Sequence, residues 1–502
     1  MIRSDNLIPL LGGAYQARSL IADAEVCENL YPEVNPQETE APAPVTHYPR
    51  EGKRLLSAPP QAGPGRGIFT TSNGALYAAV GAALYSIDHE WNWTYLGPIA
   101  NLLTPVSIDD NGTNAVLVDG SPNGYTINLA TNALAPIIDP TGIFTGSVRV
   151  DFSDTFLAFA TPRTNAWYLT LSNQIAFNAL VLAGKDSNPD PIVTFAFNVR
   201  QAWLIGEQST EVWYLAGGIP FPYQSWPNVL IPYGCAAPYS LAQADVDLFW
   251  ISRNHQGQTI AVKSKGYAVV AISTRALEAE WAGYPTVSDC IASSYQQNGH
   301  TFVLFTFPSA DKTWVYDLAT TQWHRRTYAD QNGVAHRDLT TFHTSIGSQG
   351  GFPAMIIGQD WATGQIYALD PKCYTDNGWP IVLRRSFPHV MKDMREITHV
   401  SFVADFETGG IPGSSETRGM QNSAPFLPGA EAPALSMRYS GDGGETWSNA
   451  RQKKLVSAGH YRSMMRWRGL GMARDRIYEL AWSYNGPSAL QGAYLEPLAH
   501  SA

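Results

Sequence analysis

The fold is decided by a short segment that returns along the chain, as in Leu84-Tyr85-Ser86-Ile87-Asp88, Gly124-Tyr125-Thr126-Ile127-Asn128 and Thr313-Trp314-Val315-Tyr316-Asp317. Each copy is a strand of aromatic and aliphatic residues. Counting one aromatic anchor in each copy gives Tyr85, Tyr125, Trp167, Trp213, Tyr267, Trp314 and Tyr367. The anchors are 40, 42, 46, 54, 47 and 53 residues apart. Four-stranded propeller blades repeat every ~40–50 residues, so the spacing predicts a β-propeller.

Further strands and turns around the anchors support the same architecture. An apolar strand precedes most anchors, as in 115–118 and 302–305, and Gly, Asn or Asp follows it. Such bounded strands are what a blade needs, and long helical periodicity is absent between 60 and 385. We therefore predict an all-β protein with a seven-bladed propeller at 61–385. Six blades are the alternative count, and two β-sandwiches with coincidental spacing are the competing architecture.

The sequence has a different character on both sides of the repeats. Residues 1–60 are Pro-rich and include a helix-like stretch, Arg18–Leu30. Residues 386–502 contain three predicted strands: Thr398–Val403, Leu435–Tyr439 and Ile477–Tyr484. The stretch 408–433 is rich in Gly, Pro and Ser, which predicts a long loop. We predict that 1–60 joins 386–502 in a β-rich platform domain.

Charge is sparse and unevenly distributed. Charged residues make up 15% of the chain, against about 25% in an average soluble domain, which fits a surface largely hidden against partners. The net charge is −10, and it divides into +3 for 381–502 (14 Lys+Arg, 11 Asp+Glu) and −13 for the remainder (19 against 32). This balance argues against a general nucleic-acid binder.

The C-terminal region contains a concentrated basic stretch. Only Asp475 opposes its eight cations, which are Arg451, Lys453, Lys454, Arg462, Arg466, Arg468, Arg474 and Arg476. One interpretation is a solvated strand face with partial salt bridging. The other is a contact with an acidic partner or a neighbouring subunit.

The cysteines and the apolar runs indicate in which cellular compartment the protein resides. Cys27, Cys235, Cys290 and Cys373 are scattered, without zinc-ligand spacing. We expect buried thiols in a reducing compartment. Residues 1–13 do not resemble a signal peptide, and no run approaches the ~18 apolar residues of a membrane span.

The most specific local motif is Ser440-Gly441-Asp442-Gly443-Gly444-Glu445-Thr446-Trp447, which fits the Asp-box pattern S-x-D-x-G-x-T-W. Its Ser and Asp side chains accept turn amides, and a Gly supplies positive φ. We therefore predict a structural turn.

Catalytic motifs are missing from the sequence. The phosphate-binding, zinc-protease and nucleophile-elbow patterns do not occur. The carboxylate pairs Asp109-Asp110 and Glu278/Glu280 do not stand out as the two carboxylates of a glycosidase. His300 and His324 are expected to be satisfied polar residues of blade strands. We predict no enzyme activity, and no catalytic, cofactor-binding or metal-binding residue.

An ordered set of segments resembles the packaged-DNA stabilisation proteins of podoviral tails, also called tail hub or nozzle proteins. The segments are Gly13-Ala14-Tyr15, Arg18-Ser19, Cys27–Glu33, Gly234–Ser240, Leu248–Ile251, Gly266-Tyr267, Ile272–Thr274, Gly299–Phe302, Phe307-Pro308, Thr313–Asp317, Trp323-His324, Thr363–Tyr367 and Asp376–Gly378. One departure is Pro49-Arg50-Glu51-Gly52, which interrupts a Pro-Gly pair of the family pattern.

The resemblance implies a structural protein of the virion tail, assembled in the host cytoplasm. It implies a ring of identical subunits, with six as the expected number, below the portal and its adaptor. Such a ring extends the channel for double-stranded DNA, helps to retain the packaged genome and carries spikes or fibres. No catalytic residue carries over from this family.

Two other functions compete with a tail protein. A sialidase-like glycoside hydrolase would also combine a propeller with an Asp-box, but it would carry several boxes and an arginine triad. A cellular propeller scaffold would carry closely matched blades, whereas these blades vary widely.

Overall fold

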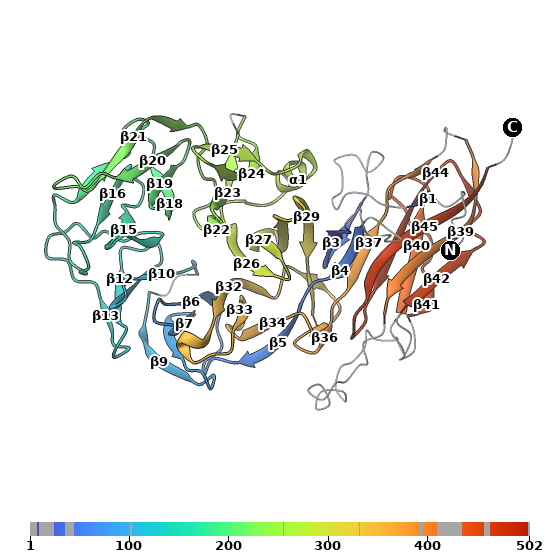
Figure 1. The fold of residues 1–502 in the computed structure, drawn as a ribbon, viewed down its shortest axis with the longest axis horizontal. Coiled ribbons are helices and arrows are strands. Elements are labelled where there is room, and N and C mark those ends of the chain that lie inside the picture. The colour runs from blue at the N-terminus through green and yellow to red at the C-terminus, as the bar shows by residue number, and fades with distance from the viewer. Residues whose placement is uncertain are drawn as a thin grey trace.

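The computed structural model describes residues 8–9, 25–35, 45–100, 103–254, 256–330, 332–391, 395–408, 434–455 and 462–499. Figure 1 shows a ring of sheets joined on one side to a second, smaller body of strands. Within the described residues there is one α-helix, α1 (Arg275–Trp281), and two short 3-10 helices, η1 (Pro308–Ala310) and η2 (Ser348–Gly350). The protein is therefore all-β, as predicted.

Five blades of the ring are separate antiparallel sheets of four consecutive strands. The first contains β6 (Gly65–Thr70), β7 (Leu76–Val80), β8 (Ala83–Ile87) and β9 (Trp93–Pro98). The second contains β10 (Ser107–Asp110), β11 (Asn114–Val118), β12 (Gly124–Asn128) and β13 (Leu134–Pro136). The third contains β14 (Val150–Ser153), β15 (Phe156–Ala160), β16 (Ala166–Leu169) and β17 (Leu182–Gly184). The fourth contains β18 (Ile192–Asn198), β19 (Gln201–Gly206), β20 (Thr210–Leu215) and β21 (Tyr223–Ile231). The fifth contains β22 (Ala242–Ala244), β23 (Asp247–Arg253), β24 (Thr259–Lys265) and β25 (Ala268–Ala271).

The last two blades are four-stranded parts of larger sheets, which brings the ring to seven blades among the described residues. The sixth contains β26 (Ile291–Gln297), β27 (His300–Phe307), β28 (Lys312–Asp317) and β29 (Gln322–Arg326). The seventh contains β32 (Thr340–Ile346), β33 (Met355–Asp360), β34 (Ile366–Asp370) and β5 (Gly52–Ser57). The short pair β30 (Tyr328–Ala329) and β31 (Ala335–His336) lies between them in sequence.

The ring is closed by an N-terminal strand. β5 pairs antiparallel with β34, so that Gly52 lies opposite Asp370 and Lys53 opposite Leu369. β35 (Thr375–Asp376) then pairs with the other side of β5, and β36 (Trp379–Pro380) pairs with β35. The prediction that residues 1–60 join the platform is therefore wrong for 52–57, which belong to the seventh blade.

Six of the seven predicted anchors lie in the third strand of a blade, for example Tyr85 in β8 and Trp314 in β28. Tyr267 is the exception, because it lies in the turn between β24 and β25 and its side chain is 46% exposed. The first strands of neighbouring blades contact one another, as β10 contacts β14 and β26 contacts β32. The first strand of each blade therefore lies nearest the axis.

Hydrophobic clusters fill the interfaces between the blades. Tyr77 of the first blade packs with Leu117 of the second, and Trp167 of the third lies 5.5 Å, edge to face, from Trp213 of the fourth. Trp281 of α1 packs beside Trp323 of the sixth blade, with ring centroids 5.8 Å apart. The aromatic repeat thus supplies the contacts that hold neighbouring blades together.

The second body is a β-sandwich built from both ends of the described chain. One sheet has the order β3 (Leu30–Val34), β4 (Val45–Pro49), β45 (Ala489–Ala499), β39 (Ile397–Glu407) and β42 (Arg462–Arg468), with β1 (Ile8–Pro9) on β45 and β43 (Met472–Ala473) on β39. The facing sheet has the order β2 (Cys27–Glu28), β37 (Leu383–Ser386), β44 (Asp475–Trp482), β40 (Ala434–Ser440) and β41 (Arg451–Lys454), with β38 (Val390–Met391) on β44.

One core lies between the two sheets of the sandwich. Leu30 and Phe402 come from the first sheet, and Leu435 and Tyr478 come from the second. The rings of Phe402 and Tyr478 stack with centroids 4.7 Å apart. The three strands predicted in 386–502 lie in this sandwich as β39, β40 and β44, and a platform role for it stays a prediction.

Two details of the flanks differ from the sequence prediction or lie beyond it. The helix-like stretch Arg18–Leu30 contains strand β2 and the start of β3 in its described part, so the helix prediction is wrong there. The predicted loop lies outside the described residues, apart from Thr408. No helix in the described part of the chain is long and apolar enough to cross a membrane.

Candidate functional site

The junction between propeller and sandwich contains a buried group of charged side chains. Arg50 lies between β4 and β5, and its guanidinium pairs with the carboxylate of Asp376. Its other bonds reach the Asn29 side chain at 2.8 Å, the Glu51 carbonyl at 2.8 Å and the Thr327 carbonyl at 3.0 Å. Arg50 thereby ties the sandwich strands, the sixth blade and β35 together.

Two more ion pairs extend this group into the propeller. Glu51 Oε1 accepts from Arg326 Nη1 at 2.6 Å and also from the Tyr295 hydroxyl. Lys53 pairs with Asp338, and both side chains are fully buried. The neighbouring cations hold the pKa of Asp338 well below its ordinary value despite burial. The Asp338 carboxylate therefore stays charged beside Lys53, which suits a structural junction.

The facing sheet of the sandwich continues directly into the sixth blade. β2 pairs in parallel with β29, with Glu28 opposite Arg325, and the Asn29 amide donates to the Arg325 carbonyl at 2.8 Å. The result is one ten-stranded sheet that runs from the propeller into the sandwich. The two bodies are therefore joined by backbone hydrogen bonds as well as by ion pairs.

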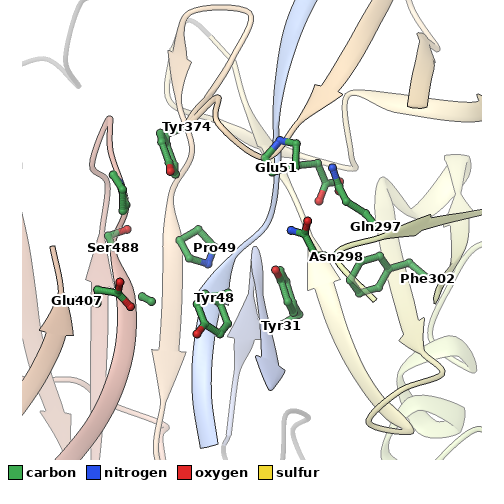
Figure 2. Close-up of a pocket in the computed structure, with 13 residues that line it drawn as sticks. Tyr31, Tyr48, Pro49, Glu51, Gln297, Asn298, Phe302, Tyr374, Glu407 and Ser488 are labelled. Atoms are coloured by element: carbon green, nitrogen blue, oxygen red, sulfur yellow. The ribbon is translucent and has the colours of Figure 1, made fainter. Parts of the chain in front are cut away.

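A pocket of about 210 Å³ opens beside this junction (Figure 2). We call it the junction pocket, and its lining residues are Tyr31, Tyr48, Pro49, Glu51, Gln297, Asn298, Phe302, Pro371, Tyr374, Glu407, Pro487, Ser488 and Ala489. They come from β3, β4 and the following residues, the β26–β27 turn, the loop before β35, and the sandwich. The pocket thus exists only when propeller and sandwich are assembled together.

The junction pocket is aromatic and acidic. Burial raises the pKa of Tyr31, Tyr48 and Tyr374. Nearby carboxylates raise it further, Glu33 before Glu407 for Tyr48 and Asp370 before Glu407 for Tyr374. The hydroxyls therefore stay protonated near neutral pH. No Lys, Arg or His lines the pocket, so its walls offer no charge for an anion.

The basic stretch lies where the edges of the two sandwich sheets meet. Arg451 of β41 donates to the carbonyls of Arg468 at 3.0 Å and Gly469 at 3.2 Å, and Trp467 Nε1 donates to the Arg451 carbonyl at 3.1 Å. Arg462 binds the Asp405 carboxylate with two nitrogens. The geometry matches the predicted strand face with partial salt bridging, and a contact with an acidic partner stays a prediction.

The Asp-box forms the predicted turn between β40 and β41. Ser440 Oγ accepts from the Gly444 amide at 2.8 Å, and Asp442 Oδ1 accepts from the Thr446 amide at 2.9 Å. Gly444 has a φ of 97°. The Arg438 guanidinium lies 4.5 Å from the centre of the Trp447 ring. The box thus stabilises a hairpin of the sandwich.

The histidines singled out in the sequence differ from each other. His300 Nδ1 forms a hydrogen bond of 2.8 Å with Asp317. This bond is the main reason why the pKa of His300 is raised. His324 is buried, which lowers its pKa to about 3, and neither ring nitrogen has a partner among the described residues. The prediction of a satisfied polar residue is confirmed for His300 and wrong for His324.

The carboxylate pairs do not form a sugar-cleaving site. Asp110 accepts from the Ser72 amide at 2.8 Å, whereas Asp109 points to the third blade and accepts from the Phe152 amide at 2.6 Å. Burial, and then the charge of Asp151, raise the pKa of Asp109 well above its ordinary value. A glycosidase holds its two carboxyl groups ~5 Å or more apart across a cleft, whereas Asp109 and Asp151 accept from the backbone amides of Phe152 and Phe197 between neighbouring blades.

The second pair and the cysteines also have structural surroundings. Glu278 accepts from Arg275 at 2.7 Å and Glu280 accepts from Tyr284 at 2.8 Å, so each has its own local partner on or next to α1. All four cysteines are free thiols, and three of them are buried while Cys373 is half-buried. No cluster of three or more His, Cys, Asp or Glu side chains suited to a metal occurs in the described part of the chain.

Seven four-stranded blades closed by an N-terminal strand define the protein as a β-propeller. The family model described as "Bacteriophage P22 Gp10, beta-propeller" matches residues 7–340, which is more than half of the chain. The chain therefore belongs to this family, and it is a phage structural protein and a component of the virion.

Other comparisons are remote. No curated protein matches the chain. The WD40 domain of Neurospora crassa Pan2 is 10% identical, with 64% of this chain and 96% of that chain covered and a TM-score of 0.40. A chain from a structure of S. cerevisiae Dbp5 bound to Nup159, Gle1, IP6 and ADP is 8% identical, with 68% and 100% covered and a TM-score of 0.40. At these identities and TM-scores, neither structure indicates a function for this chain.

Proposed function

We propose that the chain is a nozzle or hub subunit of a short-tailed phage tail. It forms a ring, with six subunits as the expected number, below the portal–adaptor complex. The ring extends the DNA channel, helps to retain the packaged genome and conducts it during ejection. The observation that carries the proposal is the family match, which spans the N-terminal sandwich strands and most of the propeller.

The rigidity of the subunit supports this role. A shared ten-stranded sheet and buried ion pairs join propeller and sandwich, so that the chain can transmit load as one block. In the proposed arrangement the propeller lies outward, and the sandwich surrounds the channel together with its neighbours. Closed rings of identical subunits use heterologous contacts, and a chain with only 15% charged residues has surface to devote to them.

The net charge of −10 argues against general binding of DNA, but it is not the charge of the proposed channel wall. Residues 381–502, which supply most strands of the sandwich, carry +3, and the remainder of the chain carries −13. We propose no sequence-specific DNA contact. The remaining partners in this proposal are the adaptor and portal above and tail spikes or fibres beside it, with assembly in the host cytoplasm, where thiols stay reduced.

We further propose that the protein acts without catalysis. The single Asp-box lies on a sandwich hairpin, and each carboxylate singled out in the sequence is engaged in a structural contact. A sialidase-like activity would need a glycoside cleft with two suitably spaced carboxylates. The described residues offer a pocket of a different chemistry instead.

Mass photometry tests the ring directly. The purified protein is measured alone, with a portal–adaptor complex, and with the portal without its adaptor as the control. We expect a single subunit in isolation and a closed ring only on the adaptor. A protein that stays a single subunit in the presence of the adaptor, under conditions in which portal and adaptor assemble, would refute the proposal.

A further inference from the structure

We propose that the junction pocket binds a cationic side chain, namely the guanidinium of an arginine presented by a neighbouring polypeptide in the assembled particle. The inference concerns a site that the ring proposal does not assign. It rests on the shape of the pocket, on its aromatic walls and on two carboxylates.

The size of the junction pocket fits one large side chain. Its volume is about 210 Å³, which is below the ~300–1,000 Å³ of typical small-molecule sites. Prolines at 49, 371 and 487 stiffen its rim. A preformed, narrow pocket of this kind accepts an extended side chain without rearrangement of the protein.

Aromatic rings provide the walls. Tyr31 and Tyr48 stack at a centroid distance of 6.0 Å with an interplanar angle of 29°, and Tyr31 meets Phe302 edge to face at 5.5 Å. Figure 2 shows Tyr374 on the opposite side of the pocket from Tyr31. Tyrosine faces attract cations within ~6 Å of the ring centre, and a planar guanidinium also stacks on them.

The carboxylate of Glu51 forms part of the pocket wall. Glu51 is 4% exposed, and its Oε1 already accepts from Arg326 and Tyr295. Its Oε2 accepts from none of the described residues and keeps some exposed surface, so it can accept from a group that enters the pocket. Figure 2 shows the Glu51 side chain on the pocket wall beside Gln297. An entering N–H donor would complete this carboxylate.

A second carboxylate, that of Glu407, also lines the pocket. Glu407 is exposed at the end of β39 and accepts from Gln491 Nε2 at 3.0 Å. Arg326 balances the charge of Glu51 behind the wall. No cation lines the pocket itself, so the charge of Glu407 favours a positive ligand and disfavours a phosphate or carboxylate. A guanidinium has five donors in a fixed plane, and Glu51, Asn298 and Ser488 offer acceptors around one cavity.

The test uses the full-length protein and two short probes. Acetyl-Gly-Arg-Gly-amide and the same peptide with citrulline in place of arginine are titrated by isothermal calorimetry at low salt. Citrulline has nearly the same shape but no charge. We expect the arginine peptide to bind at least tenfold more tightly, and to weaken as salt is added. Equal binding of the two peptides, or binding of neither, overturns the proposal.

Variants place the binding in the junction pocket. Glu407→Gln and Tyr374→Ala change half-buried or exposed lining residues, so that the fold is retained, whereas Glu51 is part of a buried ion pair and is left unchanged. We expect each variant to weaken the arginine peptide severalfold, with an unchanged thermal midpoint. Glu445→Gln, an exposed carboxylate on the Asp-box turn, is the matched control. Arginine-selective binding that neither lining variant weakens places the ligand elsewhere and overturns the proposal.

A second measurement, which rests on the proposed ring, distinguishes which polypeptide presents the arginine. The Tyr374→Ala/Glu407→Gln variant is examined by mass photometry on the portal–adaptor complex. Loss of the ring identifies a second copy of this chain or the adaptor as the source, and an intact ring identifies another protein of the particle. Because the peptide titration uses the isolated subunit, its result stands even if the ring proposal fails.

Discussion

Replacing Arg50 with methionine should destabilise the protein strongly. Arg50 is 1% exposed and its partner Asp376 is 2% exposed. Methionine fills much of the same space but leaves Asp376 as a buried carboxylate, with Lys53 Nζ at 3.8 Å as its remaining cation. Breaking a buried pair by removing one partner costs about 3–5 kcal/mol, and the residual lysine places the expected loss near the lower end of that range.

The assay is urea-induced unfolding, followed by tryptophan fluorescence, with the midpoint of each transition compared between variants. Arg54→Met is the matched control, since Arg54 lies close by in β5 but is half exposed, 3.8 Å from Asp370. An exposed pair contributes about 0–1 kcal/mol. The double variant Arg50→Met/Asp376→Leu removes both charges and should regain most of the loss.

Two results would refute this reasoning about Arg50. One is an Arg50→Met midpoint equal to that of the control variant. The other is a double variant no more stable than Arg50→Met alone. Either would mean that the pair contributes little, and that the backbone pairing of β2 with β29 and β5 with β34 holds the junction by itself.

Three further predictions concern titratable groups. Burial and Asp151 raise the pKa of Asp109 in the folded protein, so the folded state keeps a proton that the unfolded chain releases. The stability of the protein should therefore fall as the pH rises from the ordinary Asp value through the folded pKa. Asp109→Asn should flatten this fall, which unfolding midpoints measured across that pH range would show. Burial raises the pKa of Cys27 and Cys235 to about 11, so a thiol reagent near neutral pH should label them only after denaturation; labelling of the native protein at either site, detected by mass spectrometry, would contradict this. The hydrogen bonds of the Asp-box lower the pKa of Asp442 to about 2, so its carboxyl resonance should titrate near that pH, and an ordinary Asp value would show that the turn is open in solution.

The repeating strands could be predicted from the sequence because most blades bury their aromatic anchor locally, as Tyr85, Trp167 and Tyr367 show. The exception shows the limit of the pattern. Gly266-Tyr267 precedes an apolar run and resembles the other anchors, but Gly266 has a φ of 60° and opens a two-residue turn. The third strand of that blade, β24, contains no aromatic residue. Alternation alone cannot separate a turn aromatic from a strand aromatic.

The long-range pairings could not be predicted. β5 is a short strand, and nothing in Gly52–Ser57 specifies that its partner lies beyond residue 365. The junction pocket draws Tyr31, Phe302 and Ser488 from segments far apart in sequence. Short spacings and periodicity describe local structure, whereas these contacts depend on how the whole ring closes.

Ring closure by an N-terminal strand also sets an order on synthesis. β5 leaves the ribosome early, yet β34 follows it by about 310 residues, or roughly 15–60 s at ~5–20 residues per second. β4 can pair with β45 only later still, after β45 has been synthesised. A prematurely terminated chain therefore keeps both N-terminal pairing edges open and has neither a complete last blade nor a complete sandwich. Synthesis as far as β45 acts as a checkpoint for the fold, because the last blade and the sandwich are both complete only then.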